Sequence, residues 1–135
     1  MPKFVATDHK ITVNGVNLST SLQSVDLTIQ ADEVDTTTFG GNFKTVTGGL
    51  LSGSVTLNFY QDFGAGAVDA TLWPLLNTAA TVVITPTSST VSSLNPSYSA
   101  VCLVSQYQPF ASTVGDLATL SVTWPTSGTV TRATA

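Results

Sequence analysis

The densest group of potentially reactive side chains in this chain is an acidic cluster formed by Asp32, Glu33 and Asp35. Carboxylates at this density can hold Ca²⁺, which takes about six to eight oxygen ligands. The cluster lacks the regular Asp-x-Asp-x-Asp-Gly order of a calcium-binding loop. Two other interpretations stay open. One is a solvated acidic turn between two strands. The other is a contact between subunits, in which a carboxylate meets Lys44 or Arg132 of a neighbour.

Histidine and cysteine each occur once, as His9 and Cys102. A catalytic triad needs a carboxylate that holds the histidine against a nucleophile. Asp8 is adjacent to His9, but neighbouring side chains on an extended chain point to opposite sides. Cys102 lies in the apolar run 100–104, which indicates a buried structural thiol. We therefore expect no enzyme activity, and a hydrolase is the weakest of the candidate functions.

The glycine pairs and the aromatic residues suggest no cofactor site. Gly48-Gly49 and the segment 64–66 are not followed by Lys-Ser/Thr, so neither matches a phosphate-binding loop. Aromatic side chains can form a platform for sugars, but most of these fall on apolar faces, which favours core packing. They are Phe39, Phe43, Phe59, Tyr60, Trp73 and Trp124. We expect neither a metal nor an organic cofactor.

The composition favours a protein that buries its surface against other copies of itself. Its 135 residues suit a single domain, 1–135, with a hydrophobic core. Charged residues are 9% of the chain, against about 25% in an ordinary soluble domain. Because a sparsely charged monomer has poor colloidal stability, self-association is one physical solution. The alternative is a neutral β-domain of a larger particle.

The charge and hydropathy patterns also exclude some classes. With a net charge of −4 and only four basic residues, the chain lacks the basic patch that tight nucleic-acid binding requires. No apolar run approaches the roughly 20 residues that span a bilayer. The first residues lack the apolar segment of a signal peptide, so we expect synthesis in a cytoplasm.

Two segments, 21–30 and 50–60, show the strict alternation of half-buried antiparallel strands. Val25 and Leu27 alternate with polar residues in the first segment, and Val55 and Leu57 do so in the second. Gly53 marks a predicted bulge. The polar positions of the two strands are Ser24, Asp26, Thr28, Gln30, Ser54, Thr56 and Asn58.

The other segments complete a mainly-β pattern. Asn14-Gly15 predicts a tight hairpin turn. A helix is expected at about residues 65–77, with Asp62 near its first turn and Pro74 limiting its length. Further strands are expected at 10–13, 81–85, 98–107 and 117–124, a long loop at 40–49 and an N-terminal arm at 1–8. The sequence thus predicts an antiparallel β-sandwich or barrel with one flanking α-helix.

Three parts of the middle region occur in an order that is found in a known family. They are ADEVDTTTFG at 31–40, FKT at 43–45 and GGLLSGSVTLNFYQD at 48–62. With a helix following, this order resembles the major tail tube proteins of long-tailed bacteriophages. The resemblance covers about 40 residues closely and the rest in outline.

The resemblance implies a non-enzymatic structural subunit. Six subunits would form a ring, their sheets would join into an inner β-barrel, and rings would stack into a hollow tube through which DNA passes without specific binding. The loop 40–49 and the arm 1–8 would reach adjoining rings, and the polar strand positions given above would face the lumen. Partners would be further copies, the tape measure and the tail terminator, and the location would be the virion tail. The inter-subunit candidates are Asp32, Glu33, Asp35, Phe39, Phe43, Lys44 and Arg132.

Other functions stay open at this point. The chain is short for a tail tube subunit, so a tail terminator, an inner tube subunit of a contractile tail or a tail-completion protein is an alternative within the same fold. A carbohydrate- or receptor-binding β-sandwich module is the alternative from a different class.

Overall fold

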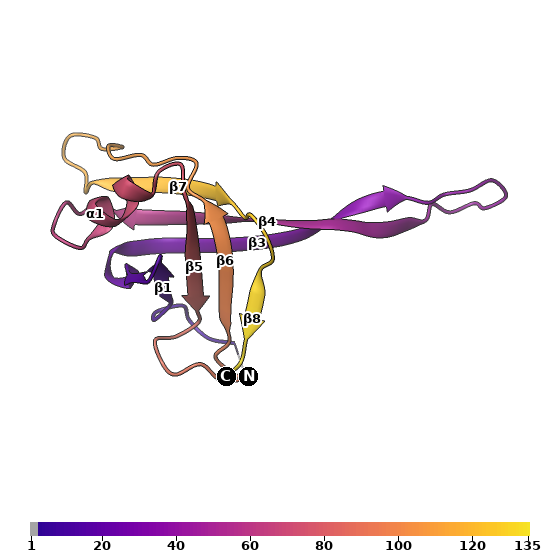
Figure 1. The fold of residues 1–135 in the computed structure, drawn as a ribbon, viewed down its shortest axis with the longest axis horizontal. Coiled ribbons are helices and arrows are strands. Elements are labelled where there is room, and N and C mark those ends of the chain that lie inside the picture. Colours follow the sequence, from indigo (N-terminus) through magenta and orange to yellow (C-terminus); the bar gives the residue numbers. More distant parts are fainter. Residues whose placement is uncertain (1–2) are drawn as a thin grey trace.

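Two antiparallel sheets pack against each other, and one hairpin projects far beyond them (Figure 1). The computed structural model describes residues 3–135. The smaller sheet has the order β3-β4-β7, and the larger has the order β2-β1-β5-β6-β8. The predicted antiparallel β-sandwich with a flanking helix is confirmed. The strands are β1 (Lys10–Val13), β2 (Val16–Asn17), β3 (Leu22–Asp35), β4 (Val46–Tyr60), β5 (Ala79–Thr85), β6 (Ser97–Leu103), β7 (Thr119–Pro125) and β8 (Thr131–Ala133).

The hydrophobic core lies between the sheets. Alternation along β4 and β7 directs one set of side chains inward, where they are fully or almost fully buried: Val55, Leu57, Phe59, Leu120, Val122 and Trp124. Ile11, Val13 and Val82 meet them from the larger sheet. The indole Nε1 of Trp124 donates a hydrogen bond to the backbone oxygen of Gln106 at 2.9 Å, so the largest core side chain leaves no polar atom unpaired.

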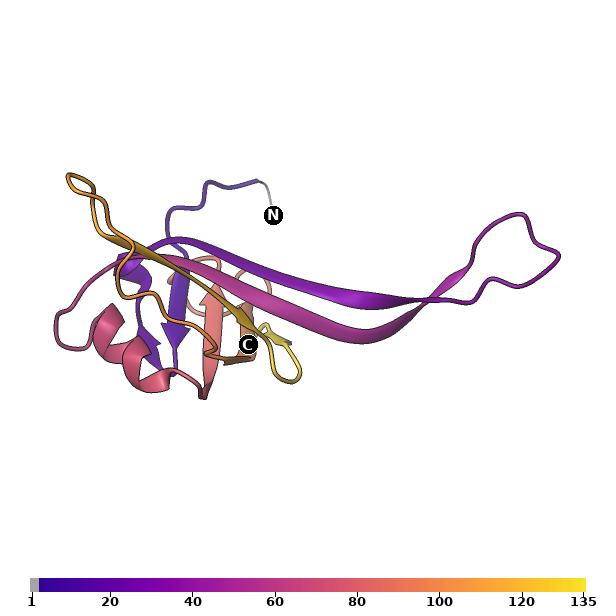
Figure 2. The same cartoon turned by 90° about the horizontal axis from the view of Figure 1, so that it is seen from above.

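The projecting hairpin is formed by β3 and β4, whose ladder continues out to the pair Asp35–Val46. Figure 2 shows it leaving the body as a curved two-stranded ribbon. The predicted loop 40–49 was therefore placed too late, because 46–49 belong to β4 and the irregular segment is 36–45. Backbone pairing with β3 and the β-propensity of Val46 and Thr47 outweigh the two glycines at 48–49.

The bulge expected at Gly53 was also wrong. Gly53 pairs directly with Ile29, and the register shifts nearer the tip, where Gly49 and Leu50 lie opposite Asp32 alone. A Cβ on Gly53 would stand 3.0 Å from the Thr28 oxygen and 3.4 Å from the Thr126 side chain. Gly53 is thus required by the close approach of neighbouring chain segments.

The Asn14-Gly15 turn between β1 and β2 is confirmed. Both residues have positive φ, 51° and 86°, as a two-residue hairpin of this kind requires.

The helical segment is shorter than predicted. α1 spans Val68–Leu72, and a 3-10 turn follows at Trp73–Leu75. Pro74 lies inside that turn and cannot donate the backbone hydrogen bond that would continue an α-helix. Asp62 does not cap the helix with its side chain, since its Oδ1 accepts instead from the Gly64 amide at 2.8 Å. Within residues 3–135, no helix is long and apolar enough to cross a membrane.

Candidate functional site

One side of the smaller sheet is a continuous polar surface, which we call the polar face. The register pairs Ser24 with Asn58, Asp26 with Thr56 and Thr28 with Ser54, and then continues from β4 onto β7. All seven of the polar strand positions predicted from sequence lie on this one face. The sequence reasoning did not include the residues that β7 adds to it, although their alternation was visible: Thr119, Ser121 and Thr123.

Side chains of the polar face hydrogen-bond to one another across strands. Asn58 Nδ2 donates to Ser24 Oγ at 2.6 Å, and the Thr56 and Thr123 hydroxyls lie 3.2 Å apart. Asp26 is the one charged residue among these positions. The face therefore presents neutral hydroxyl and amide groups, with a single negative charge.

The two edges of the smaller sheet, β3 and β7, differ in how far their backbone groups are already hydrogen-bonded. Among the described strands, none pairs with the outer edge of β3. At the edge of β7, Gln106 Nε2 donates to the Thr123 backbone oxygen at 3.1 Å, and Pro125 contributes no amide hydrogen. An unpaired strand edge invites further strands, and the structure leaves the β3 edge open for one.

The hairpin tip, defined as residues 36–45, is closed by threonines. The Thr36 and Thr45 hydroxyls lie 2.8 Å apart, and the Thr36 amide donates to the Thr45 oxygen at 2.9 Å. Asp35 Oδ1 accepts from the Thr37 amide at 2.8 Å. Hydrogen bonds from Thr37 lower the pKa of the Asp35 carboxyl below its usual value. The tip therefore has a defined conformation that is held by hydrogen bonds.

Two aromatic side chains at the tip are exposed to solvent. Phe39 is fully exposed and Phe43 is 87% exposed. The expectation that most of the six selected aromatic residues pack in the core was wrong, since only Phe59 and Trp124 are buried. Tyr60 and Trp73 are also exposed. Large apolar side chains gathered on a projection mark an interaction surface.

The acidic cluster lies on the outer half of the hairpin. Asp32 and Glu33 are exposed, and Asp35 is held by Thr37 as described. In residues 3–135, no group of three His, Cys, Asp or Glu side chains is arranged to hold a metal ion. The cluster sits in a strand rather than in a turn between two strands.

Asp8 and His9 bind different partners. The Asp8 carboxylate accepts from the Ser88 amide and hydroxyl at 3.1 and 2.8 Å, which lowers the pKa of Asp8. His9 Nδ1 lies 2.8 Å from the Pro86 oxygen, which can only accept, so Nδ1 carries hydrogen. These bonds fasten the end of the predicted arm 1–8 to the segment after β5. Residues 1–2 of that arm lie outside the described residues.

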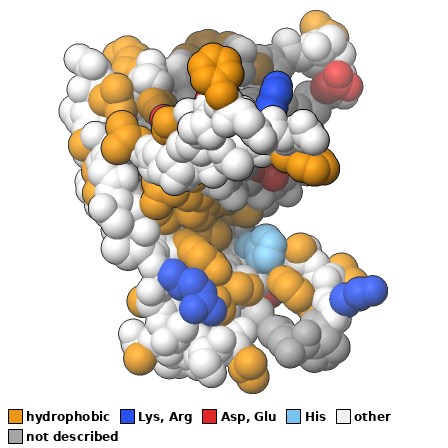
Figure 3. All heavy atoms as spheres, turned by 90° about the vertical axis from the view of Figure 1, so that its right-hand side faces the viewer, with side chains coloured by type: hydrophobic (Ala, Val, Ile, Leu, Met, Phe, Trp, Pro, Cys, Tyr) orange, Lys and Arg blue, Asp and Glu red, His pale blue; other side chains and the backbone are white. Residues whose placement is uncertain are grey.

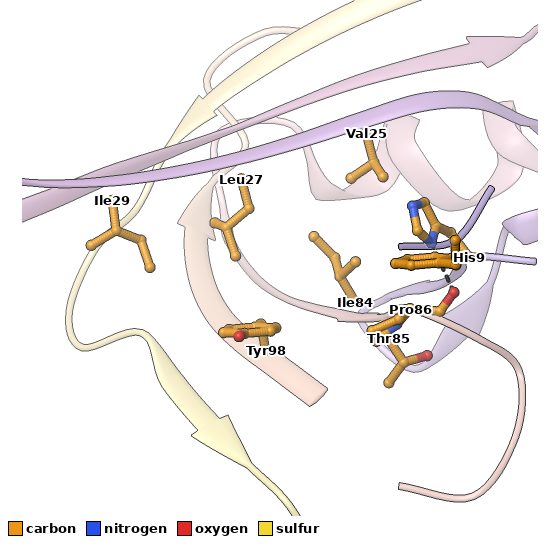
Figure 4. A pocket seen from close by; sticks show the side chains of 9 residues that line it. His9, Val25, Leu27, Ile29, Ile84, Thr85, Pro86 and Tyr98 are labelled. Carbon is orange, nitrogen blue, oxygen red and sulfur yellow. Dashed lines mark hydrogen bonds between the residues drawn. The ribbon is translucent and has the colours of Figure 1, made fainter. Parts of the chain in front are cut away.

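An apolar groove of about 410 Å³ opens between the sheets beneath β3 (Figure 4). Val25, Leu27 and Ile29 point down from β3 toward Ile84 and Tyr98 of the larger sheet. The complete lining is Phe4, His9, Val25, Leu27, Ile29, Ile84, Thr85, Pro86 and Tyr98. Sequence reasoning missed the groove because it arises from where the two sheets diverge.

Cys102 is a free, buried thiol, as predicted. Its burial raises the pKa of the thiol to about 11. The thiolate is therefore a negligible species at neutral pH.

Comparison with known proteins gives a fold but no sequence family. No family model matches the chain, and no curated protein is similar to it in sequence. A chain from the virion of a native gene transfer agent particle superimposes with a TM-score of 0.70 at 12% identity, covering 93% of this chain and 95% of that one. The two chains share one fold. A chain from the tail of an empty gene transfer agent particle, with C6 symmetry, gives a TM-score of 0.59 at 13% identity, covering 94% of both chains. The fold expected from the resemblance to tail tube proteins is thus found in a virion and a tail.

Proposed function

We propose that this protein is a structural tail subunit that assembles into hexameric rings, which stack into a hollow tube for DNA passage. The observation that carries the proposal is the polar face, which spans all three strands and is backed by a buried apolar face. The match to a chain in a C6-symmetric tail supports the same assembly. The role is structural and non-enzymatic.

The polar face would line the lumen. Six copies would place six Asp26 carboxylates around it, together with neutral hydroxyls. A mildly negative wall repels phosphates, and in about 0.15 M salt this repulsion fades within roughly 8 Å. DNA would therefore pass without adhesive ion pairs.

Ring closure would use the edges of the smaller sheet. The open edge of β3 would meet the β7 side of the next subunit, which removes an edge that otherwise promotes uncontrolled aggregation. The predicted inter-subunit residues lie on the hairpin except Arg132, which lies in β8; those on the hairpin are Asp32, Glu33, Asp35, Phe39, Phe43 and Lys44. We propose that the hairpin reaches the adjoining ring in place of the predicted loop 40–49. The tape measure and the tail terminator would be the partners inside and at the end of the tube.

The direct test is the assembled state of the purified protein. Rings should have a mass near 84 kDa, six copies of 14.0 kDa, and negative-stain images should show tubes of uniform bore. A protein that stays monomeric at high concentration would contradict the proposal, and glycan binding by that monomer would favour the alternative module.

A variant separates ring formation from stacking. Phe39→Ser combined with Phe43→Ser removes the exposed aromatics of the tip without touching the core. We expect hexamers by native mass spectrometry and no tubes in stained images. Phe110→Ser is the control, since it removes another exposed phenylalanine that lies outside the tip, against the ring of Phe63. Normal tubes from the tip variant would refute the stacking role of the hairpin.

A further inference from the structure

The groove beneath β3 has a mainly apolar lining. It lies where the hairpin leaves the body, and its walls come from both sheets and from the N-terminal segment. Figure 3 shows hydrophobic side chains in the hollow below the hairpin, with the single histidine at its rim. A volume of about 410 Å³ is in the range that accepts a small ligand or a few inserted side chains.

The tip of the same molecule cannot fill this groove. Ile29 lines the groove, and the β3–β4 ladder continues from it to Asp35 without a break in pairing other than one bulge. At about 3.3 Å per residue, these six positions carry the tip roughly 20 Å away. An occupant with the chemistry of the tip must therefore come from another copy.

The tip and the groove match in chemistry. The tip presents the exposed rings of Phe39 and Phe43, and the adjoining strands carry the acidic cluster. At the groove, Arg132 Nε donates to the Tyr98 hydroxyl at 3.2 Å, which holds an exposed guanidinium beside a groove-lining ring. A planar guanidinium suits carboxylate partners. The groove with Arg132 beside it is thus complementary to the tip, whose aromatic rings lie beside the acidic cluster.

We propose that the groove of one subunit receives the hairpin tip of a second copy in the adjoining ring. The rings of Phe39 and Phe43 enter the groove, and a carboxylate of the acidic cluster pairs with Arg132. This rests on the proposed stacking of rings and names the surface that receives the hairpin. Because the two surfaces differ, the contact is heterologous and continues along a stack without closing.

A disulfide test maps the contact directly. The variant Ile29→Cys/Phe43→Cys places one thiol at the groove and one at the tip, and native Cys102 stays silent because it is buried. Oxidised tubes should give a ladder of covalent multimers on non-reducing gels. The control Phe43→Cys/Val114→Cys places the second thiol on a fully exposed loop residue outside the groove, and it should give none. A ladder from the control pair alone would overturn the proposal.

A charge test covers the case in which the cysteine variants do not assemble. Arg132→Glu should raise the concentration needed for tube formation by about tenfold, since it sets a carboxylate against the acidic cluster. The control is Lys10→Glu, a cation of the larger sheet that does not line the groove, and it should change that concentration by less than about twofold. Equal effects from both would contradict the proposal. Absence of tubes from the unaltered protein would instead contradict the proposed function.

Discussion

The inner and outer halves of the β3–β4 hairpin share one hydrogen-bonded ladder but differ in what covers them. Within the body, Leu57 is fully buried against the larger sheet. Six residues earlier on the same strand, Leu51 is 74% exposed. Both belong to the alternating set on one side of β4. The difference shows that the outer half has apolar side chains without a layer to pack on, as expected of a surface completed by another copy.

The largest expected difference is in core packing. Leu57→Ala should lower the free energy of unfolding of the monomer by about 2–5 kcal/mol, because it leaves a cavity between the sheets. Leu51→Ala should change it by less than about 0.5 kcal/mol. Urea denaturation followed by tryptophan fluorescence measures both, since the buried Trp124 becomes exposed on unfolding while Trp73 is already exposed. Similar losses would show that the outer half is already packed in the isolated subunit.

Backbone constraints should matter in the outer half even where side-chain packing does not. A Cβ on Gly49 would lie 3.1 Å from Val34 Cγ2 and 3.2 Å from Asp32 Cβ, whereas one on Gly48 would meet nothing within 4 Å. Gly49→Ala should therefore destabilise the ladder locally by about 1 kcal/mol. Hydrogen exchange at the hairpin amides should rise about fivefold for this variant. The matched variant Gly48→Ala should show no increase, and equal behaviour would contradict the close contact at the bulge.

The polar contacts of the body should give a smaller effect that depends on pH. The Tyr107 hydroxyl donates to Asp69 Oδ1 at 2.6 Å. Desolvation and then this hydrogen bond raise the pKa of Tyr107 to about 12 from 10.0. The raised pKa means that the stabilisation is complete below pH 10 and is lost as the pH rises toward 12. Tyr107→Phe should cost about 1 kcal/mol at pH 7 and remove this part of the alkaline loss.

Unfolding curves at pH 7, 10 and 11 would measure that difference. Cys102 titrates in the same alkaline range in both proteins, so subtraction isolates Tyr107. Tyr60→Phe, at the end of β4 that lies in the body, serves as the hydroxyl-deletion control. Parallel pH profiles for the wild type and Tyr107→Phe would contradict the assigned hydrogen bond.

The same comparison shows what could be predicted from sequence. In the inner half, alternation correctly predicted which side chains of β4 are buried and that Val25 and Leu27 of β3 are half-buried, since that face has a hydrophobic layer to meet. In the outer half, every position is exposed and alternation carries no information. The strand ends at Asp35 and Val46 depend on backbone pairing, so the glycine-containing segment 46–49 was predicted to belong to a loop although it pairs with β3.

The candidate site divides in the same way. The polar face followed from local pattern, and β7 extended it through pairing between residues about 65 positions apart, such as Thr56 and Thr123. The exposure of Phe39 and Phe43 did not follow from local pattern, because both lie among polar residues and glycines, and only the resemblance placed them between subunits. The groove depends on the angle at which the two sheets diverge, and a local sequence pattern does not determine that angle.

The strand order β3-β4-β7 also determines when the smaller sheet can be completed during synthesis, because β7 is made last. β7 begins about 60 residues after β4 ends, which at roughly 5–20 residues per second is a delay of about 3 to 12 s. Until then the inner half of β4 has one unpaired edge, and the place of Trp124 in the core is empty. The nascent β3–β4 hairpin thus has two unpaired strand edges, one on β3 and one on β4. In the finished subunit only the β3 edge is fully unpaired among the described strands, because β7 covers β4 and Gln106 and Pro125 partly block β7. Several ribosomes on one messenger RNA would bring such unpaired edges close together. A chaperone that binds the nascent chain during this interval would therefore have the largest effect in preventing aggregation.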